Sequence, residues 1–561
     1  MNDDYHLLRA SEPGWRQKLR VPVMVAGTLL YGSVVGSAVW FGWPHYEWLA
    51  ILLQGTLLLP SLLYGLRGTG DCQPPKPEWQ RPGLWTAVAI GVFLAVSAVV
   101  SAFTLKGVSI PDESAYRFQA RILRTGHLMA QAPPGAPNIP EAAPTPLAFN
   151  HTIVWRKGWF AKYPLGWPLV LALPEGLGLE WLVNPLLAVC ILMFTASIAR
   201  SLGGPMVAFW AVALLVLSPC FLAPTVELMS HTLAGVLVAA SCWAWMRGAS
   251  AQKVAYFCLT YGLIGLAFHV RPYTALLAAV TLTAGTVCAL RRDRAFLARV
   301  LAIGCGLGVL TVGSVLLYNW TFTGRAWVSP YALSLGVSVP REITPSMHEL
   351  LEAMASFWRF EAQSTLTFFF PLIFVLAGVG IWKNWRKSPI VVLLPALFLV
   401  TVVGYLVETI PSASVLAERF WFEVYFAVAI PAAQGIAVVV SALQTPRKAL
   451  VAGGVALLAV QAIVTGGAIR IMMRRSGPST AVSRAATPYR DCRCVVFLKS
   501  SPPFFYGEHL NLNDPDWRRA GAFYAVDPGP NQRVAWMRTL GRDRFVVLTY
   551  DPLRGVGQRV E

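Results

Sequence analysis

The chain has 561 residues, of which 55% are hydrophobic and only 13% are charged, and its mean hydropathy is +0.54. A soluble protein carries about 25% charged residues, so this composition excludes soluble, fibrous and disordered chains and indicates a polytopic membrane protein. The net charge of +18 does not indicate nucleic acid as a partner here. Lys and Arg lie mostly in short connections between apolar segments, where they set membrane orientation and meet anionic lipid headgroups.

Apolar segments of the length that a membrane helix needs, about 20 residues, recur along the chain. About thirteen spans are predicted, with the break before Pro272 separating two of them. No cleavable signal peptide is predicted, because a polar N-terminus precedes a full-length span. The predicted spans cover 21–43, 47–66, 84–105, 182–200, 205–219, 227–246, 254–269, 272–290, 300–320, 365–383, 389–407, 420–442 and 449–470.

Lys and Arg concentrate in alternate connections, which predicts the side of the membrane on which each connection lies. The segments 1–20, 67–81 and 291–299 are basic, whereas 44–46 and 220–226 contain neither residue. Because basic connections stay in the cytoplasm, the N-terminus is predicted to be cytoplasmic and the C-terminus periplasmic or extracellular. The expected location is the inner membrane of a bacterial cell.

This orientation divides the chain into five parts. They are a cytoplasmic N-terminus, three membrane helices, an extracytoplasmic loop with interfacial helices, a membrane bundle with an outer loop at 321–364, and a polar C-terminal domain. Their boundaries are 1–20, 21–105, 106–181, 182–470 and 471–561. Strand-like pieces at 495–498 and 545–548 predict a small α/β fold for the last part. There Cys492 and Cys494 are one residue apart, too close for an ordinary disulfide, so a bridge is not expected.

Ionisable side chains gather at the predicted outer ends of the spans, beneath the two large loops. Such groups at membrane depth are costly and mark functional sites by default. A transporter places them near the midplane within broken helices, so clustering at one face favours a catalytic cleft. The group comprises Asp112 and Glu113 after the third span, Glu227 and His231 opening the sixth, His269 and Arg271 before the eighth, and Arg419 and Glu423 opening the twelfth.

Spacing suggests roles for several of these residues. Glu227 and His231 are four residues apart and would share one helix face, where they could bind a divalent metal or an acceptor, or form a structural pair. Arg419 and Glu423 have the same spacing and favour a structural ion pair. Arg271 could hold a lipid phosphate through its guanidinium group, with snorkelling toward the interface as the alternative.

Short motifs resemble the GT-C superfamily of integral-membrane glycosyltransferases. The run Pro-Asp-Glu-Ser-Ala-Tyr-Arg-Phe-Gln-Ala at 111–120 directly follows a span, and Lys-Tyr-Pro-Leu-Gly-Trp follows at 162–167. The likeness is greatest to the branch with protein O-mannosyltransferases and the lipid A aminoarabinose transferase. It implies a polytopic α-helical bundle of about 13 transmembrane helices, with a large first outer loop and a small C-terminal α/β extracytoplasmic domain. Further similar pieces are Asn184-Pro185, Tyr318-Asn319, Thr323-Gly324, Ser329-Pro330-Tyr331 and Glu418-Arg419-Phe420.

The resemblance implies transfer of a sugar, with inversion at the anomeric carbon, from a polyprenyl-phosphate donor to an acceptor glycan, lipid or protein. The transfer takes place at the outer face of the cytoplasmic membrane. The resemblance makes Asp112, the first acid of the pair, the catalytic base, and Glu113 the second acid. Lys162 resembles a basic residue at the donor phosphate, although its spacing is shifted by one residue, and Arg271 and Arg419 could add positive charge.

Other positions match the family more loosely. Glu227 corresponds to a later outer acid, and Tyr163 belongs to a set of loop aromatics expected at the membrane interface or against the sugar. A divalent metal could supply part of the positive charge, but the sequence contains no dense ligand cluster that demands one. In relatives the acidic pair usually follows the first span, whereas here two additional spans precede it. This difference indicates a divergent subgroup of the family.

Two other functions fit the composition. A flippase of a lipid-linked sugar would have charged residues deep in its spans and would depend little on Asp112. A polymerase or ligase of surface polysaccharide would be expected to have an outer loop with paired arginines, which the sequence lacks. The large outer loops and the polar C-terminal domain favour the transferase over the flippase. The Asp-Glu pair after a span favours it over the polymerase or ligase.

Overall fold

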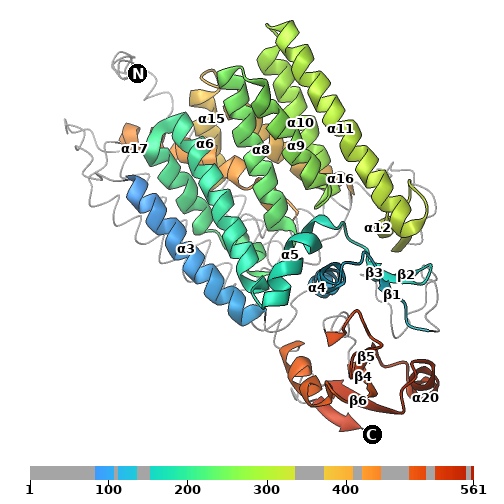
Figure 1. Cartoon of the computed structure of the whole chain (residues 1–561). Coiled ribbons are helices and arrows are strands. Elements are labelled where there is room, and N and C mark those ends of the chain that lie inside the picture. The colour runs from blue at the N-terminus through green and yellow to red at the C-terminus, as the bar shows by residue number, and fades with distance from the viewer. Residues whose placement is uncertain are drawn as a thin grey trace.

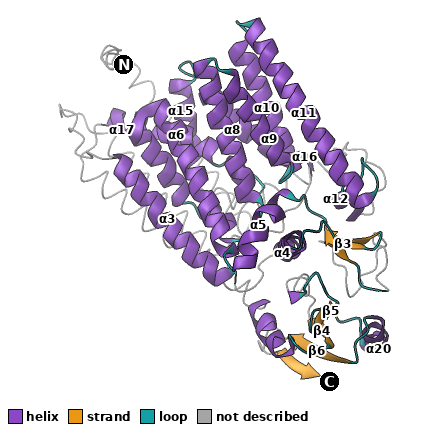
Figure 2. Cartoon of the chain, viewed as in Figure 1, coloured by secondary structure: helices purple, strands orange, loops and turns teal. Residues whose placement is uncertain are grey.

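A computed structural model describes residues 82–105, 111–134, 152–334, 372–408, 420–443, 479–500, 512–550 and 557–560. The predicted spans at 21–43, 47–66 and 449–470, most of the 321–364 loop, and Arg419 lie outside these residues. The described chain is mostly helical. Its long helices pack side by side into a bundle, and a small domain with strands lies beyond one end of it (Figures 1 and 2).

Long apolar helices form the bundle and follow the predicted spans closely. By length and composition, α3, α6, α10 and α11 can each cross a membrane, and α7 (Pro219–Val226) with α8 gives a fifth, bent candidate. The chain is therefore a multi-pass membrane protein, while the total of about thirteen spans stays a prediction. The bundle helices are α3 (Pro82–Thr104), α6 (Glu180–Val216), α8 (His231–Ala251), α9 (Val254–Phe268), α10 (Pro272–Leu290), α11 (Arg294–Thr323), α15 (Leu372–Asn384), α16 (Ile390–Glu408) and α17 (Phe426–Leu443).

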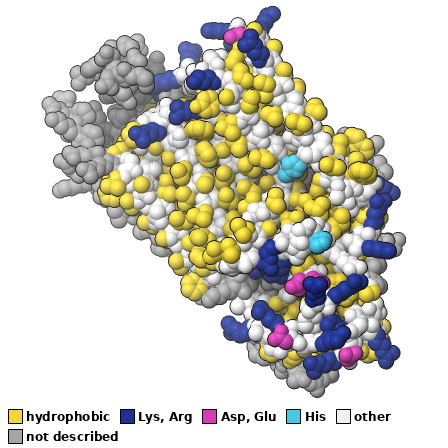
Figure 3. Space-filling view, viewed as in Figure 1, with side chains coloured by type: hydrophobic (Ala, Val, Ile, Leu, Met, Phe, Trp, Pro, Cys, Tyr) yellow, Lys and Arg dark blue, Asp and Glu magenta, His cyan; other side chains and the backbone are white. Residues whose placement is uncertain are grey.

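The side-chain surface agrees with a membrane location. Figure 3 shows a broad apolar surface over the bundle, with Lys and Arg gathered at its ends and on the C-terminal domain. On the long helix α11, Val309 is 72% exposed and Leu310 is 69% exposed. Water would make so much exposed apolar surface costly, whereas lipid tails solvate it.

Two of the predicted helix breaks are present. Helix α6 loses helical backbone angles at Gly203 and Gly204, and Gly204 has a φ of 79°, a conformation that glycine adopts at no steric cost. This divides α6 into two helices, as predicted. A turn at 269–271 separates α9 from α10, also as predicted.

The predicted start of the sixth span is wrong. Helix α7 ends at Val226, Glu227 has an extended backbone (φ −92°, ψ 157°), and α8 begins only at His231, with an angle of 119° between the two helices. Glu227 and His231 therefore do not share a helix face. The backbone between them binds side chains of other elements, which replace helical hydrogen bonds.

The segment that the sequence predicts as the first outer loop contains two short helices and a small sheet. Helix α4 (Pro111–Arg124) is followed by the antiparallel strands β1 (Ala130–Gln131), β2 (Thr152–Trp155) and β3 (Gly158–Ala161), in the order β1-β3-β2, and by α5 (Gly166–Leu177). On α5, Leu169, Leu173 and Leu177 are all more than 60% exposed. Such an apolar face suits the interfacial helix expected for this segment.

The described part of the C-terminal segment combines a sheet with helices. Strands β4 (Cys494–Ser500), β5 (Phe523–Val526), β6 (Arg544–Tyr550) and β7 (Gly557–Val560) form one sheet in the order β5-β4-β6-β7. Strand β4 pairs in parallel with β5 and β6. Helix α20 (Pro530–Thr539) connects β5 to β6.

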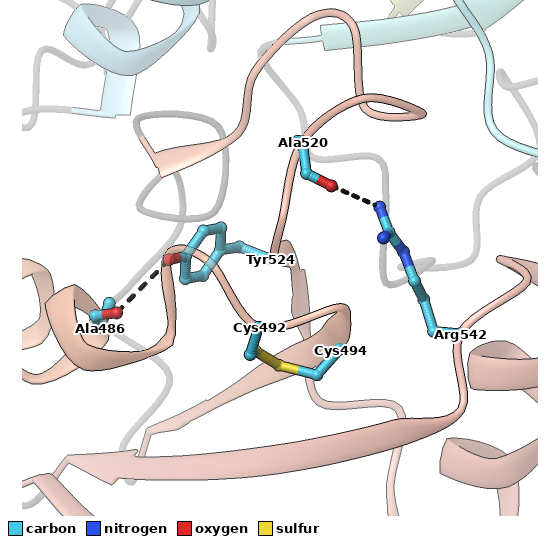
Figure 4. Close-up of a disulfide and its surroundings, with 6 residues drawn as sticks. All are labelled: Ala486, Cys492, Cys494, Ala520, Tyr524 and Arg542. Atoms are coloured by element: carbon cyan, nitrogen blue, oxygen red, sulfur yellow. Dashed lines mark hydrogen bonds between the residues drawn. A yellow bond between two sulfur atoms is a disulfide. The ribbon is translucent and has the colours of Figure 1, made fainter.

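The expectation that Cys492 and Cys494 stay unbridged is wrong, because a disulfide joins them (Figure 4). The backbone turns tightly at this point, and the Cys494 amide donates a hydrogen bond to the Cys492 carbonyl. This turn leaves the two Cα atoms 5.2 Å apart, a separation that a disulfide spans. Spacing along the sequence alone did not reveal the turn.

Helices α15 and α17 approach each other closely at two glycines. A Cβ atom placed on Gly380 would collide with the carbonyl oxygen of Pro431, and one on Gly435 would collide with that of Leu376. Small residues allow such backbone contact between membrane helices, where packing drives association.

We therefore expect Gly380→Ala to destabilise the protein by about 1–3 kcal/mol, the usual cost of overpacking. Gly378→Ala on the same helix is the matched control, because no atom lies within 4 Å of a Cβ placed there. Thermal unfolding in detergent measures both. Equal midpoints for the two variants would contradict the close packing of α15 on α17.

Candidate functional site

The acidic pair lies in the first turn of α4, between the bundle and the C-terminal domain (Figure 1). Asp112 is 7% exposed and Glu113 is 1% exposed. The N-terminal end of a helix attracts negative charge through its unpaired amides and its dipole. The two buried acids therefore lie at the end of the helix where negative charge is most favourable.

Glu113 is bound to the turn that precedes α8. Its Oε1 atom accepts a hydrogen bond of 2.8 Å from the Leu228 amide. The same turn is held from two other sides: Asn184 donates to the carbonyl of Met229 at 3.0 Å, and Trp167 donates to that of Leu228 at 2.9 Å. One acid of the pair is thus engaged in holding structure.

Asp112 faces a different set of groups. Its Oδ1 atom accepts a hydrogen bond from the Tyr163 hydroxyl. Burial and the nearby Asp112 charge raise the pKa of Tyr163 well above its usual value. The hydroxyl therefore stays protonated and is the donor in this hydrogen bond. The structure therefore brings together Asp112 and Tyr163, which are 51 residues apart in the sequence.

Lys162 lies beside this pair. Its ammonium nitrogen is 4.7 Å from the ring centre of Tyr331 and 5.3 Å from that of Tyr163, distances at which aromatic rings attract cations. Burial lowers the pKa of Lys162, and the charge of Asp112 partly opposes this shift. Lys162 is thus a partly desolvated cation whose charge the Asp112 carboxylate offsets in part.

Arg271, His231 and Glu423 form a second, neighbouring cluster. The Arg271 Nε atom lies 2.8 Å from Glu423 Oε1, and His231 Nδ1 lies 2.9 Å from the same oxygen. The other two guanidinium nitrogens contact His231 Nε2 at 3.3 Å and the Tyr405 hydroxyl at 3.1 Å. All three nitrogens of Arg271 therefore have protein partners, and Glu423 offsets its charge.

The position of Glu423 differs from the one that the sequence predicts. It lies in the 3₁₀ turn η3 (Phe422–Val424) ahead of α17, not on an α-helix as the spacing from Arg419 suggested. Among the described residues it forms an ion pair with Arg271 and contacts His231 Nδ1. A pairing across 192 residues, as between His231 and Glu423, leaves no signal in local spacing.

Backbone and ring contacts join the two clusters. The Tyr116 ring is 4.7 Å from the Tyr163 ring, and the Tyr116 hydroxyl lies 3.3 Å from the Ser230 Oγ atom, next to His231. The Gly166 amide donates to the His269 carbonyl at 2.8 Å. Tyr116 was not singled out from the sequence, although its position four residues after Asp112 puts both on one face of α4.

The described residues do not fit the metal site that the sequence left open. No three His, Cys, Asp or Glu side chains come together among them. Glu227 and His231 belong to different elements, and both His231 nitrogens face protein groups. We therefore derive no step through a metal.

No protein-family model matches the sequence, and no curated protein sequence matches it. Solved structures of GT-C glycosyltransferases are nevertheless similar to the chain, as the motifs indicated. ArnT from Cupriavidus metallidurans, bound to undecaprenyl phosphate, has 12% identity and a TM-score of 0.49, covering 82% of this chain and 93% of that one. Its apo state gives the same identity and TM-score over 83% and 93%.

The apo oligosaccharyltransferase of Archaeoglobus fulgidus is also similar, with 12% identity and a TM-score of 0.47. The match covers 81% of this chain but 65% of that protein. At these identities and TM-scores, the likeness assigns neither an activity nor a substrate to this chain.

Removal of the Glu423 carboxylate is expected to destabilise the fold. In Glu423→Ala the largely buried Arg271 loses its ionic partner and the buried His231 loses a hydrogen-bond partner, at a cost of about 3 kcal/mol. The control Tyr405→Phe removes one neutral hydrogen-bond partner of Arg271 and should cost about 1 kcal/mol. Thermal unfolding separates these outcomes, and a Glu423→Ala variant as stable as the wild type would show that the cluster is not intact.

Proposed function

We propose that the protein is an inverting glycosyltransferase that moves a sugar from a polyprenyl-phosphate-linked donor to an acceptor hydroxyl at the outer face of the bacterial inner membrane. The placement of Asp112 carries this proposal. It is a buried carboxylate at a helix N-terminus, hydrogen-bonded to Tyr163 and adjacent to the Lys162 ammonium. The motif resemblance at 111–120 and 162–167 supports the same reading.

Asp112 has the chemistry of a general base for this reaction. In a single displacement the acceptor oxygen bonds to the anomeric carbon while the bond from that carbon to the phosphate oxygen breaks. The carboxylate takes the acceptor proton, and the polyprenyl phosphate leaves with the bonding electron pair. Such a base must lie within hydrogen-bond reach of the acceptor hydroxyl. Tyr163, by donating to Oδ1, fixes the orientation of the carboxylate.

Lys162 is the best candidate to stabilise the leaving phosphate. Positive groups held in place at the developing charge are among the largest contributions to catalysis. Lys162 is 7% exposed and contacts two aromatic rings, so it is positioned in advance. Arg271 is a weaker candidate than the sequence suggested, because Glu423, His231 and Tyr405 already contact its guanidinium nitrogens. Arg419 stays a prediction.

The roles of the remaining acids follow from their contacts. Glu113 holds the turn before α8 and is proposed to position α4 instead of reacting. Asp112 lies in the first turn of α4, His231 at the start of α8 and Arg271 at the N-cap of α10. This placement at helix ends does not favour the alternative of a flippase.

Asp112→Asn is expected to fold normally and to lose turnover by about 100-fold or more, the usual contribution of a general base. Purified protein with a polyprenyl-phosphate sugar and an extracytoplasmic extract as acceptor provides the assay, with released polyprenyl phosphate as the readout. Glu113→Gln is the matched control, since its amide oxygen can still accept the Leu228 hydrogen bond. Wild-type turnover in Asp112→Asn would refute the assigned base.

Donor binding is expected to weaken at alkaline pH. Burial lowers the pKa of Lys162 below its usual value of 10.5, so this side chain loses its charge at a lower pH than an exposed lysine, and the phosphate loses its partner. Arginine stays protonated throughout this range, so Lys162→Arg should bind polyprenyl phosphate without the alkaline decline. The same decline in both proteins, measured as Kd against pH, would exclude Lys162 as the phosphate ligand.

A further inference from the structure

The C-terminal domain covers only one face of its sheet with its own helices. Parallel strands are normally buried on both faces. One face, with Val496, Tyr524 and Val546, packs against Val482 and Ala486 of the preceding helical segment. On the opposite face, α20 contributes Trp536 and Met537 only as partly buried neighbours of the cluster. The rest of this second face needs cover from elsewhere in the chain.

The first outer loop supplies that cover. Phe118 and Ile122 of α4 and Trp159 of β3 are fully buried in one cluster with Phe497 and Phe523 of the domain. The two parts of this cluster are more than 300 residues apart in the sequence. Figure 1 shows α4 and β1–β3 lying directly between the bundle and the domain.

Specific contacts fix this interface. The Trp159 ring lies 4.5 Å from the Phe118 ring and 6.4 Å from the Phe523 ring. The Trp517 indole donates to the Gln131 carbonyl at 3.0 Å. These contacts tie the domain to the loop through both rings and backbone.

Arg121 of α4 connects this helix to α5 and to the C-terminal domain. It donates to the Asn513 carbonyl of the domain at 3.3 Å and to Glu175 of α5 at 2.6 Å. Asn513 is itself fixed to β5, because its side chain accepts from the Tyr524 amide at 2.9 Å. A chain of hydrogen bonds thus runs from α5 through α4 to the domain sheet.

Helix α4 therefore has two buried faces. Tyr116 and Ala120 pack on the bundle side, with Trp167 and Leu228, while Phe118 and Ile122 pack on the domain side. The acid that the proposed function makes the catalytic base lies at the start of this helix. A shift of α4 between its two supports would displace the Asp112 carboxylate.

We propose that the C-terminal domain positions the catalytic base: its sheet, through Phe523 as a positioning residue, clamps α4 against the bundle and so sets the place of Asp112. This inference rests on the proposed function for its consequence in turnover. Its structural part, that the domain holds α4, is independent of any activity.

Two neighbouring residues of β5 give a matched test. Phe523 and Tyr524 are both buried aromatic side chains, but Phe523 faces the α4 cluster and Tyr524 faces the opposite one. Hydrogen exchange in the full-length protein reports the state of α4 and, through the β4 amides, shows that the domain is still folded. Phe523→Leu, which keeps an apolar side chain in place, is the conservative variant.

Phe523→Ala should speed exchange of the α4 amides at least tenfold, whereas Tyr524→Ala should leave α4 protected. Turnover in Phe523→Ala should fall by about 10- to 100-fold, the cost of a displacement of about 1 Å in a reacting group. The KM for the donor should be unchanged, and Phe523→Leu should fall between the wild type and Phe523→Ala in both turnover and α4 exchange.

Equal α4 exchange in the two alanine variants would overturn the clamp. If Phe523→Ala unfolds the domain, Phe523→Leu against Tyr524→Phe repeats the comparison with smaller changes. The same α4 exchange in those two would overturn the clamp as well. Absence of transferase activity in the wild type would refute the proposed function alone, because the exchange comparison needs no substrate.

Discussion

The site depends on one buried hydrogen bond, from the Leu228 amide to the Glu113 carboxylate. The turn at 227–230 interrupts the helical hydrogen-bond pattern between α7 and α8, so its backbone groups need partners from elsewhere. Glu113, Asn184 and Trp167 provide them. This requirement fixes the first turn of α4 on the bundle, and the neighbouring Asp112 is fixed with it. One acid of the pair holds structure so that the other can be presented to a substrate.

The bundle and the C-terminal domain then act on α4 from opposite sides. Each has an apolar surface that α4 completes, Tyr116 and Ala120 on one face and Phe118 and Ile122 on the other. A helix bound in this way has little freedom to move its first turn, which suits a group that must be placed to within a fraction of an ångström. Lys162, in contact with the Tyr163 and Tyr331 rings, is likewise held in place before substrate binds.

Sequence reasoning predicted what depends on local pattern. Apolar length gave the described helices within a few residues, Pro272 marked the break after α9, and alternating residues gave β4 and β6. It failed where a distant partner decides the backbone: the turn at Glu227, the 3₁₀ turn at Glu423, and the tight turn that joins Cys492 to Cys494. Asp112 and Lys162 were found through their motifs. The pairing of Arg271 with Glu423, which weakens its expected role at phosphate, depends on contacts that spacing does not encode.

The central claim is that a sugar leaves a polyprenyl phosphate by a single displacement at this site. The most direct test incubates the purified protein with a labelled polyprenyl-phosphate sugar of known anomeric configuration and an extracytoplasmic extract as acceptor. The anomeric configuration and the yield of the glycosylated product are then determined. The account predicts one polyprenyl phosphate released for each sugar transferred, with the anomeric configuration inverted. A product of retained configuration, or passage of the intact lipid across vesicles without release, would contradict it.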